Sequence, residues 1–172
     1  MWKNAGEGIS YIPVSESPTV SLLVTRVIDG DTFTGRVTSS IDSMFSELVT
    51  VRLIGVNAPE TVDPKKKPEP YGKEASDHLR ALIENKNIEL QFDATRTDVY
   101  GRWLGYVLLN GSLIQEDLLR KGYAKFEDRF GFARKTEFAQ WENEAKELKT
   151  GLWGNGKIVS VIGEGGSVIS NL

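Results

Sequence analysis

The sequence predicts an α+β domain that is mainly β, with a five-stranded barrel and three α-helices. Two observations predict this fold class. Short β-branched apolar runs are bounded by turn residues, and three other segments carry apolar side chains at helical spacing. The 172 residues are 40% hydrophobic and 26% charged. This composition is ordinary for a globular protein, and the length suffices for one domain with a hydrophobic core.

The first three strands are predicted before residue 60. Residues 22–28 and 32–37 flank the sequence Asp29-Gly30-Asp31, and an Asp-Gly pair between two apolar runs is typical of a hairpin turn. The third strand is predicted at residues 48–56. Arg52 lies inside this apolar strand, where a charged side chain requires a polar partner.

The first helix is predicted to begin at Tyr71, after a proline- and lysine-rich loop at residues 61–70. Its proposed buried face carries Ala75, Leu79, Leu82 and Ile83, which recur at helical spacing. Residues 87–92 and 103–109 read as the fourth and fifth strands, since both are short apolar runs.

Two more helices are predicted in the C-terminal third. Ser112 followed by Gln115 matches a capping box at a helix start, and Gly122 is a typical stop. Residues 136–149 form the third predicted helix. Its proposed apolar face consists of Phe138, Trp141, Ala145 and Leu148.

Five strands with a helix between the third and fourth match the order of an OB-fold barrel. We expect one such domain at residues 20–154. Residues 1–19 lack periodicity and are predicted to be an N-terminal extension, and the glycine-rich residues 155–172 a C-terminal tail. The fold alone indicates a frequent host for nucleic-acid or sugar binding, so function has to come from the residues of a site.

Composition excludes several classes of function. The chain has no cysteine, which removes disulfides, thiolate zinc sites and cysteine nucleophiles. No apolar run approaches the length of a membrane span, and the N-terminus lacks the layout of a secretion signal. The compartment stays open; export with a signal already removed is favoured over a cytoplasmic location. A net charge of −3 does not attract phosphate at long range, so nucleic-acid binding would need a local basic patch such as Lys65 and Lys66.

Charged residues on turn-rich backbone occur in three separate segments: the Asp29–Asp31 turn, the strand from Arg52 to its exit at Glu60, and Arg102 after Tyr100-Gly101. Each has an ordinary structural explanation. The Asp-Gly turn is common in hairpins, Arg52 and Glu60 could form an ion pair, and Arg102 could be an exposed hairpin charge. Two arginines and several carboxylates together suit binding of a metal ion and a phosphate group. This combination favours metal-assisted phosphodiester chemistry without a histidine base.

In that chemistry the two arginines donate bidentate hydrogen bonds to phosphate oxygens, and Glu60 accepts a proton from water. Tyr71 and Tyr100 are candidate platforms for stacking bases, and packing at the barrel rim is an equally good explanation for them. His78 is the only histidine, and we interpret it as a surface residue.

Several ordered motifs resemble the staphylococcal nuclease (thermonuclease) family. They are Val27-Ile28-Asp29-Gly30-Asp31-Thr32, Val51-Arg52-Leu53-Ile54-Gly55-Val56-Asn57-Ala58-Pro59-Glu60-Thr61, Pro64-Lys65-Lys66, Tyr71-Gly72-Lys73-Glu74-Ala75 and Arg96-Thr97-Asp98-Val99-Tyr100-Gly101-Arg102. The similarity runs in order from about Leu22 to Trp153. It implies a calcium-dependent phosphodiesterase on an OB-fold that acts on DNA and RNA and leaves 3′-phosphate ends.

The resemblance also assigns roles to individual positions. Arg52 and Arg102 match phosphate-binding arginines, and Glu60 matches the glutamate that orients or deprotonates the attacking water. Asp31 matches a calcium carboxylate, and Ala58 falls where the family uses a backbone carbonyl for calcium.

Asn57 departs from the family pattern, which has an aspartate at this position. Asparagine keeps an oxygen ligand but lacks the negative charge, which weakens a site for a hard cation. Val99 also stands where a lysine is familiar in the family. The sequence therefore predicts a monomeric nuclease for single-stranded DNA or RNA. The alternative is a weakly active or inactive OB-fold module that binds nucleic acid or protein.

Overall fold

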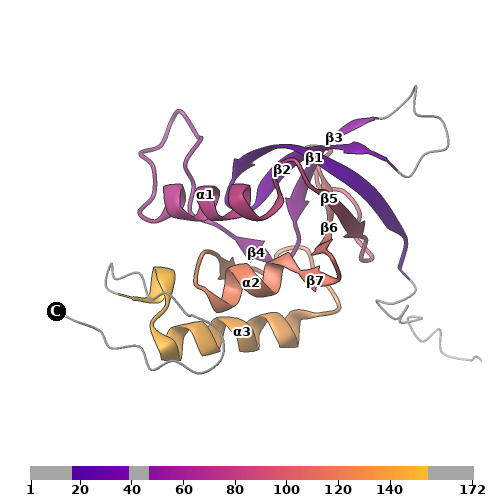
Figure 1. Cartoon of the computed structure of the whole chain (residues 1–172). Helices are drawn as coiled ribbons and strands as arrows, with labels where there is room; N and C mark the ends of the chain where they lie inside the picture. Colours follow the sequence, from indigo (N-terminus) through magenta and orange to yellow (C-terminus); the bar gives the residue numbers. More distant parts are fainter. Residues whose placement is uncertain (1–16, 39–46, 155–172) are drawn as a thin grey trace, which may run out of the picture.

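The computed structural model of the chain describes residues 17–38 and 47–154. The predicted tail at residues 155–172 and most of the predicted N-terminal extension lie outside the described residues, as do residues 39–46. Both ends of the described chain and the order of its elements are visible in Figure 1.

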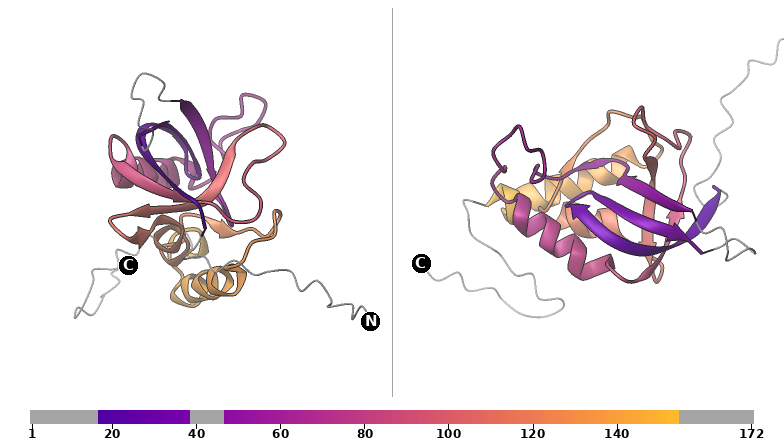
Figure 2. Two further views of the ribbon diagram at one scale, coloured as in Figure 1. Left: turned by 90° about the vertical axis from the view of Figure 1, so that its right-hand side faces the viewer. Right: turned by 90° about the horizontal axis from the view of Figure 1, so that it is seen from above.

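Five strands close into a barrel, which confirms the predicted OB-fold class. Antiparallel pairs join β1 to β2, β2 to β3, β1 to β5 and β5 to β6. A parallel pairing of β3 with β6, in which Val51 lies opposite Trp103, closes the barrel. Figure 2 shows the strands curving around the barrel from two further directions. The strands are β1 (Thr19–Asp29), β2 (Thr32–Val37), β3 (Leu48–Leu53), β5 (Asn87–Gln91) and β6 (Trp103–Leu109).

The predicted third strand is divided into two at a turn. β3 ends at Leu53, and a second strand β4 (Val56–Asn57) pairs with β8 (Lys125–Phe126) in a separate two-stranded sheet. Gly55 lies in the turn with φ of 80°, and a Cβ atom there would come within 2.5 Å of the Phe132 ring. Glycine is therefore required both by the backbone conformation and by the packing.

Three α-helices accompany the barrel, as predicted (Figure 1). α1 (Gly72–Ile83) packs on β1, and α2 (Ile114–Arg120) packs on α3 (Lys135–Leu148), which is followed by the 3₁₀ turn η3 (Gly151–Trp153). Tyr71 precedes α1 with φ of 73°. Of the apolar face predicted for α3, Phe138, Trp141 and Ala145 are buried, whereas the Leu148 side chain is 64% exposed.

The predicted capping box at the start of α2 is wrong. Ser112 belongs to the short strand β7 (Ser112–Leu113), and Leu113 is the residue that precedes the helix. The fully buried Gln115 side chain accepts a hydrogen bond from the Val107 N–H and donates one to the Gly105 carbonyl. Gln115 thus joins α2 to β6 rather than capping its own helix.

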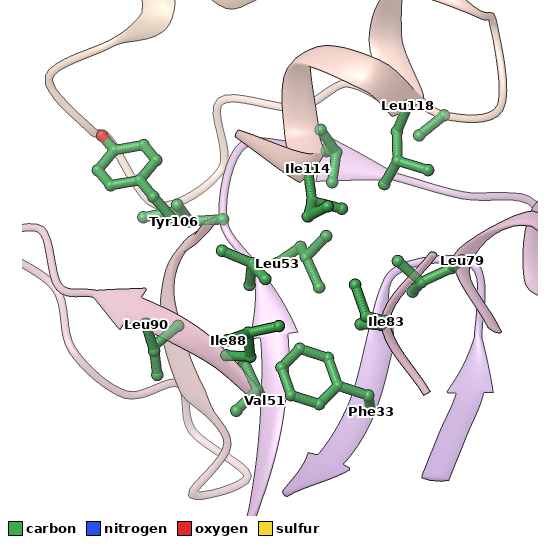
Figure 3. Packing of buried hydrophobic residues seen from close by; sticks show 14 of the residues in the cluster. Phe33, Val51, Leu53, Leu79, Ile83, Ile88, Leu90, Tyr106, Ile114 and Leu118 are labelled. Carbon is green, nitrogen blue, oxygen red and sulfur yellow. The ribbon is translucent and has the colours of Figure 1, made fainter. Parts of the chain in front are cut away.

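The hydrophobic core fills the barrel and continues beneath α1 and α2. Figure 3 shows Leu53 of β3, Ile83 of α1 and Ile114 of α2 converging on one region, each at most 3% exposed. Outward-facing groups at the barrel rim are consequently held on a rigid support. No helix in the described part of the chain is long and apolar enough to cross a membrane.

Candidate active site

The turn between β1 and β2 places two carboxylates beside the first turns of α1. Asp29 pairs with Thr32 across the hairpin, so Gly30 and Asp31 form a two-residue turn. A Cβ atom at Gly30 would lie 2.7 Å from the Cβ of Ala58 and 2.8 Å from that of Ala75. Glycine is needed here for close approach, which brings Asp31 against the exit of β4.

The Asp31 carboxylate is buried and connects three segments of the site. Its Oδ2 accepts the backbone N–H of Ala58 at 2.7 Å, and its Oδ1 accepts the Thr32 hydroxyl at 2.9 Å. The same Oδ1 lies 3.3 Å from Nε of Arg52. Asp31 therefore holds together three of the positions predicted to bind metal or phosphate.

Arg52 satisfies its charge through a set of buried acceptors. Its Nη1 donates to the carbonyls of Leu53 and Val56 at 2.7 and 2.5 Å. Its Nη2 lies 3.3 Å from Asn57 Oδ1 and 3.3 Å from Glu127 Oε2. The ion pairs of Arg52 within the described residues are with Asp31 and Glu127, not with Glu60.

Asn57 and Ala58 lie next to each other at the exit of β4. The Asn57 side chain is exposed apart from its amide contact with Arg52, and Ala58 is buried. The residues Asp31, Arg52, Asn57 and Ala58 thus form one connected cluster, and its role as a joint metal and phosphate site stays a prediction.

The Asp29 carboxyl has a raised pKa. Burial, together with the nearby negative charge of Asp31 and the more distant one of Glu60, raises the pKa of the Asp29 carboxyl to about 7. The Asp31 N–H donates to Asp29 Oδ1 at 3.2 Å and only partly offsets this effect. Sequence reasoning assigned Asp29 to turn chemistry, so its membership of an acidic cluster was missed.

Glu60 is positioned by the loop that follows β4. Its Oε1 accepts the backbone N–H groups of Val62 and Asp63 at 2.8 and 3.2 Å. Its own N–H donates to Glu69 Oε2 at 3.1 Å. Across the described residues, Glu60 Oε2 accepts no hydrogen bond, so that oxygen is available to a water molecule or a ligand.

Arg102 directly precedes β6, the parallel neighbour of the strand that carries Arg52. Its Nε donates to Asp98 Oδ2 at 2.6 Å, and its guanidinium carbon lies 5.4 Å from the centre of the Tyr100 ring. Asp98 Oδ1 accepts the N–H groups of Tyr100 and Arg102. Burial acts to raise the pKa of Asp98, but these hydrogen bonds outweigh it, so the pKa is lowered.

The predicted substrate-binding residues lie on different parts of the rim. Tyr100 is 81% exposed beside Arg102, whereas the Tyr71 ring stacks on Tyr123 at 5.6 Å. Lys65 and Lys66 are exposed on the loop before α1, and Lys66 lies 3.7 Å from Asp63. No contact brings either lysine to the two arginines within the described chain.

His78 is not a surface residue, which corrects the sequence-based interpretation. Its side chain is 18% exposed, lies 2.5 Å from the Asp117 carboxylate and stacks on Tyr123 with ring centres 3.9 Å apart. Since Tyr123 also stacks on Tyr71, three stacked rings connect the segment after α2 to α1 and to the residue that precedes it. Contacts between separate helices leave no local signal in the sequence.

Oxygen atoms are the donors that this site offers to a cation. The Asp31 carboxylate and the Asn57 amide oxygen both contact Arg52, and Ala58 contacts Asp31 through its backbone N–H; carboxylate, amide and carbonyl oxygens suit hard divalent ions. In the described residues, no group of three or more histidine, cysteine, aspartate or glutamate side chains could hold a metal by itself. A cation would therefore need the amide, the carbonyl and water as well as carboxylate.

Comparison with known proteins identifies the family. The family described as staphylococcal nuclease homologue matches residues 50–155. The chain is 36% identical to the thermonuclease of Staphylococcus hyicus over 135 residues, which are 77% of this chain and 75% of that protein. It is 38% identical to the thermonuclease of Staphylococcus intermedius over 133 residues, 74% of each protein.

A longer relative is the SPbeta prophage-derived endonuclease YokF of Bacillus subtilis (strain 168). The chain is 33% identical to it over 154 residues, which are 87% of this chain and 49% of that protein. The chain thus spans about half of that relative. The closed barrel with its three helices defines an OB-fold domain, and Asp31, Arg52 and Asn57 are in contact at one end of strands β3 and β4. This chain belongs to the staphylococcal nuclease family.

Proposed function

We propose that this chain is a calcium-dependent endonuclease that cleaves single-stranded DNA and RNA and leaves 3′-phosphate ends. Membership of the family makes it a nuclease, a hydrolase of phosphodiester bonds. The observation that carries the finer proposal is the direct contact of Arg52 with Asp31 and Asn57. This contact places a guanidinium cation beside the oxygen atoms best suited to a metal ion.

The donor set fits calcium. Asp31, Asn57 Oδ1 and the Ala58 carbonyl are hard oxygen ligands of the kind that calcium prefers. Burial, and after it the nearby Asp31 and Glu60 carboxylates, raises the pKa of Asp29 to about 7, and a cation beside the turn would offset the contribution of those carboxylates. When bound, the ion would supply positive charge next to the non-bridging phosphate oxygens.

The two arginines bind and orient the phosphate. Arg52 lies on β3, and Arg102 directly precedes β6, the strand that pairs in parallel with β3. Their N–H groups donate to phosphate oxygens, and these hydrogen bonds strengthen as negative charge grows in the transition state. Loss of one such donor costs about 10²–10³ in turnover by analogy with other anion-stabilising groups.

Glu60 holds the water that attacks phosphorus. Backbone N–H groups of Val62 and Asp63 fix its Oε1. Its Oε2 is thereby directed to accept a proton from water, which requires no histidine partner. The exposed Tyr100 ring beside Arg102 offers a stacking surface to a base, which suits single-stranded substrates.

A second function, a recognition module with weak or no catalysis, rests on Asn57. This residue supplies an oxygen without a charge, which lowers affinity for calcium. In such a module Arg52, Arg102 and Tyr100 would still bind a nucleic-acid strand.

The experiment is a calcium titration of single-stranded DNA cleavage by the wild type, Glu60→Gln and the matched control Asp63→Asn. Asp63 lies in the same loop and pairs with Lys66. The nuclease proposal expects calcium-dependent cleavage that Glu60→Gln abolishes and Asp63→Asn retains, with product ends sensitive to a 3′-phosphatase. Strand binding without cleavage at any calcium concentration would instead establish the recognition module.

A further inference from the structure

The guanidinium of Arg52 is fully engaged by the protein. An arginine has five N–H donors, and those of Arg52 face five acceptors. Nη1 donates to the two carbonyls, and Nε faces Asp31. Nη2 faces both Asn57 Oδ1 and Glu127 Oε2. A phosphate group can therefore bind Arg52 only by displacing one of these acceptors.

The contacts of Nη2 are the ones that can be exchanged. The two carbonyl contacts of Nη1 are 2.7 and 2.5 Å long and come from backbone fixed by β3 and β4. The Asp31 carboxylate is buried and has two other donors. These groups hold the guanidinium in place without help from Glu127. The Glu127 contact, at 3.3 Å, is longer than the two carbonyl contacts, and the Glu127 side chain is 16% exposed against 7% for Arg52.

Glu127 also forms an ion pair with a second cation. Its Oε1 accepts a hydrogen bond from Nη2 of Arg129 at 2.7 Å, and Arg129 is 63% exposed. The Glu127 backbone N–H donates to the Gly55 carbonyl at 3.0 Å, which fixes the main chain next to the turn before β4. Departure from Arg52 thus requires only a side-chain rotation, after which Arg129 still pairs with the carboxylate.

We propose that Glu127 is a specificity-determining residue that competes with substrate phosphate for Nη2 of Arg52. In the unliganded protein its carboxylate occupies the donor that an incoming phosphodiester needs. Substrate displaces it, and the carboxylate remains paired with Arg129. An anion that binds Arg52 more weakly than Glu127 does cannot displace the Glu127 carboxylate. The inference rests on the proposed function, because it takes Arg52 as a phosphate ligand.

The test measures the dissociation constant of a fluorescently labelled single-stranded DNA oligonucleotide in EDTA, where calcium-dependent cleavage cannot occur. Glu127→Gln removes the competing charge and should tighten binding roughly 3- to 10-fold. Asp128→Asn is the matched control. It removes the same charge one residue away, but Asp128 pairs with Lys135 at 3.1 Å instead of Arg52. Its effect should stay below about twofold because screening weakens exposed charges.

A double variant separates competition from general electrostatics. In an Arg52→Lys background, Glu127→Gln should give no more than the small gain of Asp128→Asn, since the fork-shaped donor is gone. Equal tightening by Glu127→Gln and Asp128→Asn, or weaker binding by Glu127→Gln with intact thermal stability, overturns the proposal. So does unchanged binding with a reduced kcat, which would mean that Glu127 positions Arg52. If Glu127→Gln binds the oligonucleotide more tightly and Asp128→Asn does not, but the wild type cleaves at no calcium concentration, the competition is upheld while the nuclease proposal fails.

Discussion

Asp31 and Arg52 form a buried ion pair, with Oδ1 and Nε 3.3 Å apart and each side chain 7% exposed. The proposed calcium carboxylate and the proposed phosphate ligand therefore depend on each other before any ligand binds. Arg102 is anchored differently, because its partner Asp98 belongs to the same surface turn and also accepts two backbone N–H groups. The two arginines should consequently differ in what they contribute to stability.

Arg52→Ala should destabilise the fold far more than Arg102→Ala. Loss of Arg52 leaves Asp31 buried without its cation and beside Asp29, and breaking a buried pair costs about 3–5 kcal/mol. Loss of Arg102, whose side chain is 29% exposed, leaves the buried Asp98 carboxylate with its two backbone N–H donors, so the cost should be smaller, about 1 kcal/mol. Urea denaturation measures both. Similar losses of unfolding free energy in the two variants would contradict this argument. Each of the two variants should also reduce kcat by about 10²–10³.

Asp98→Asn should impair Arg102 without unfolding the turn. The amide oxygen can still accept the N–H groups of Tyr100 and Arg102, but the amide nitrogen that replaces Oδ2 cannot accept from Arg102 Nε. We expect roughly a tenfold fall in kcat/KM, by analogy with the loss of other positioning groups, and little change in Tm. Asp98→Ala, which also removes the turn bonds, should lower Tm as well. A normal rate in Asp98→Asn would show that Arg102 needs no alignment by this carboxylate.

The fold was predictable because its main signals are local. Alternating apolar residues mark β1, β2 and β3, and helical spacing marks α1 and α3. Two failures have a common cause in contacts between distant segments. β4 and β8 are two residues long and exist only through pairing of Val56 with Phe126. Gln115 matches a capping residue in the sequence, but its side chain forms hydrogen bonds with the backbone of β6 in the folded chain.

The candidate site was predictable to the extent that its residues lie in or next to recognisable strands and turns. Asp31 lies in the β1–β2 turn, Arg52 in β3, and Asn57 and Ala58 at the end of β4. Glu127 follows a strand that has no sequence signal, and it contacts Arg52 from 75 positions away. Nothing local distinguishes Glu127 from an exposed glutamate. The same holds for His78, whose burial depends on Tyr123 of another segment.

Asp29 should make the metal-free protein less stable as pH rises from about 4 to 7. Its pKa is 3.8 in the unfolded reference and about 7 in the fold, so the folded state binds the extra proton in this window. The contribution is fully present below pH 3.8 and is lost as pH rises through 7. In EDTA at pH 8, Asp29→Asn should therefore raise the free energy of unfolding, by on the order of 2 kcal/mol.

Urea denaturation of wild type and Asp29→Asn at pH 5 and pH 8 measures this effect, and the gain should be smaller at pH 5. Asp77→Asn is the control of opposite sign. Its hydrogen bond with Lys73 outweighs burial and lowers its pKa, so removal of this carboxylate should not stabilise the protein at pH 8. Equal gains for Asp29→Asn at both pH values would show that the Asp29 carboxyl titrates normally.

Asn57→Asp should lower the calcium concentration needed for half-maximal cleavage. The substitution adds a carboxylate next to Asp31, and affinity for calcium rises with the number of charged ligands. Because Arg52 already lies 3.3 Å from Asn57 Oδ1, its guanidinium can compensate part of the new charge in the metal-free protein. We expect a shift of about tenfold, measured by calcium titration of single-stranded DNA cleavage. Asp63→Asn should leave the midpoint unchanged. An unshifted midpoint in Asn57→Asp would mean that residue 57 does not bind the ion, and that the calcium site is built from the other oxygens of the turn.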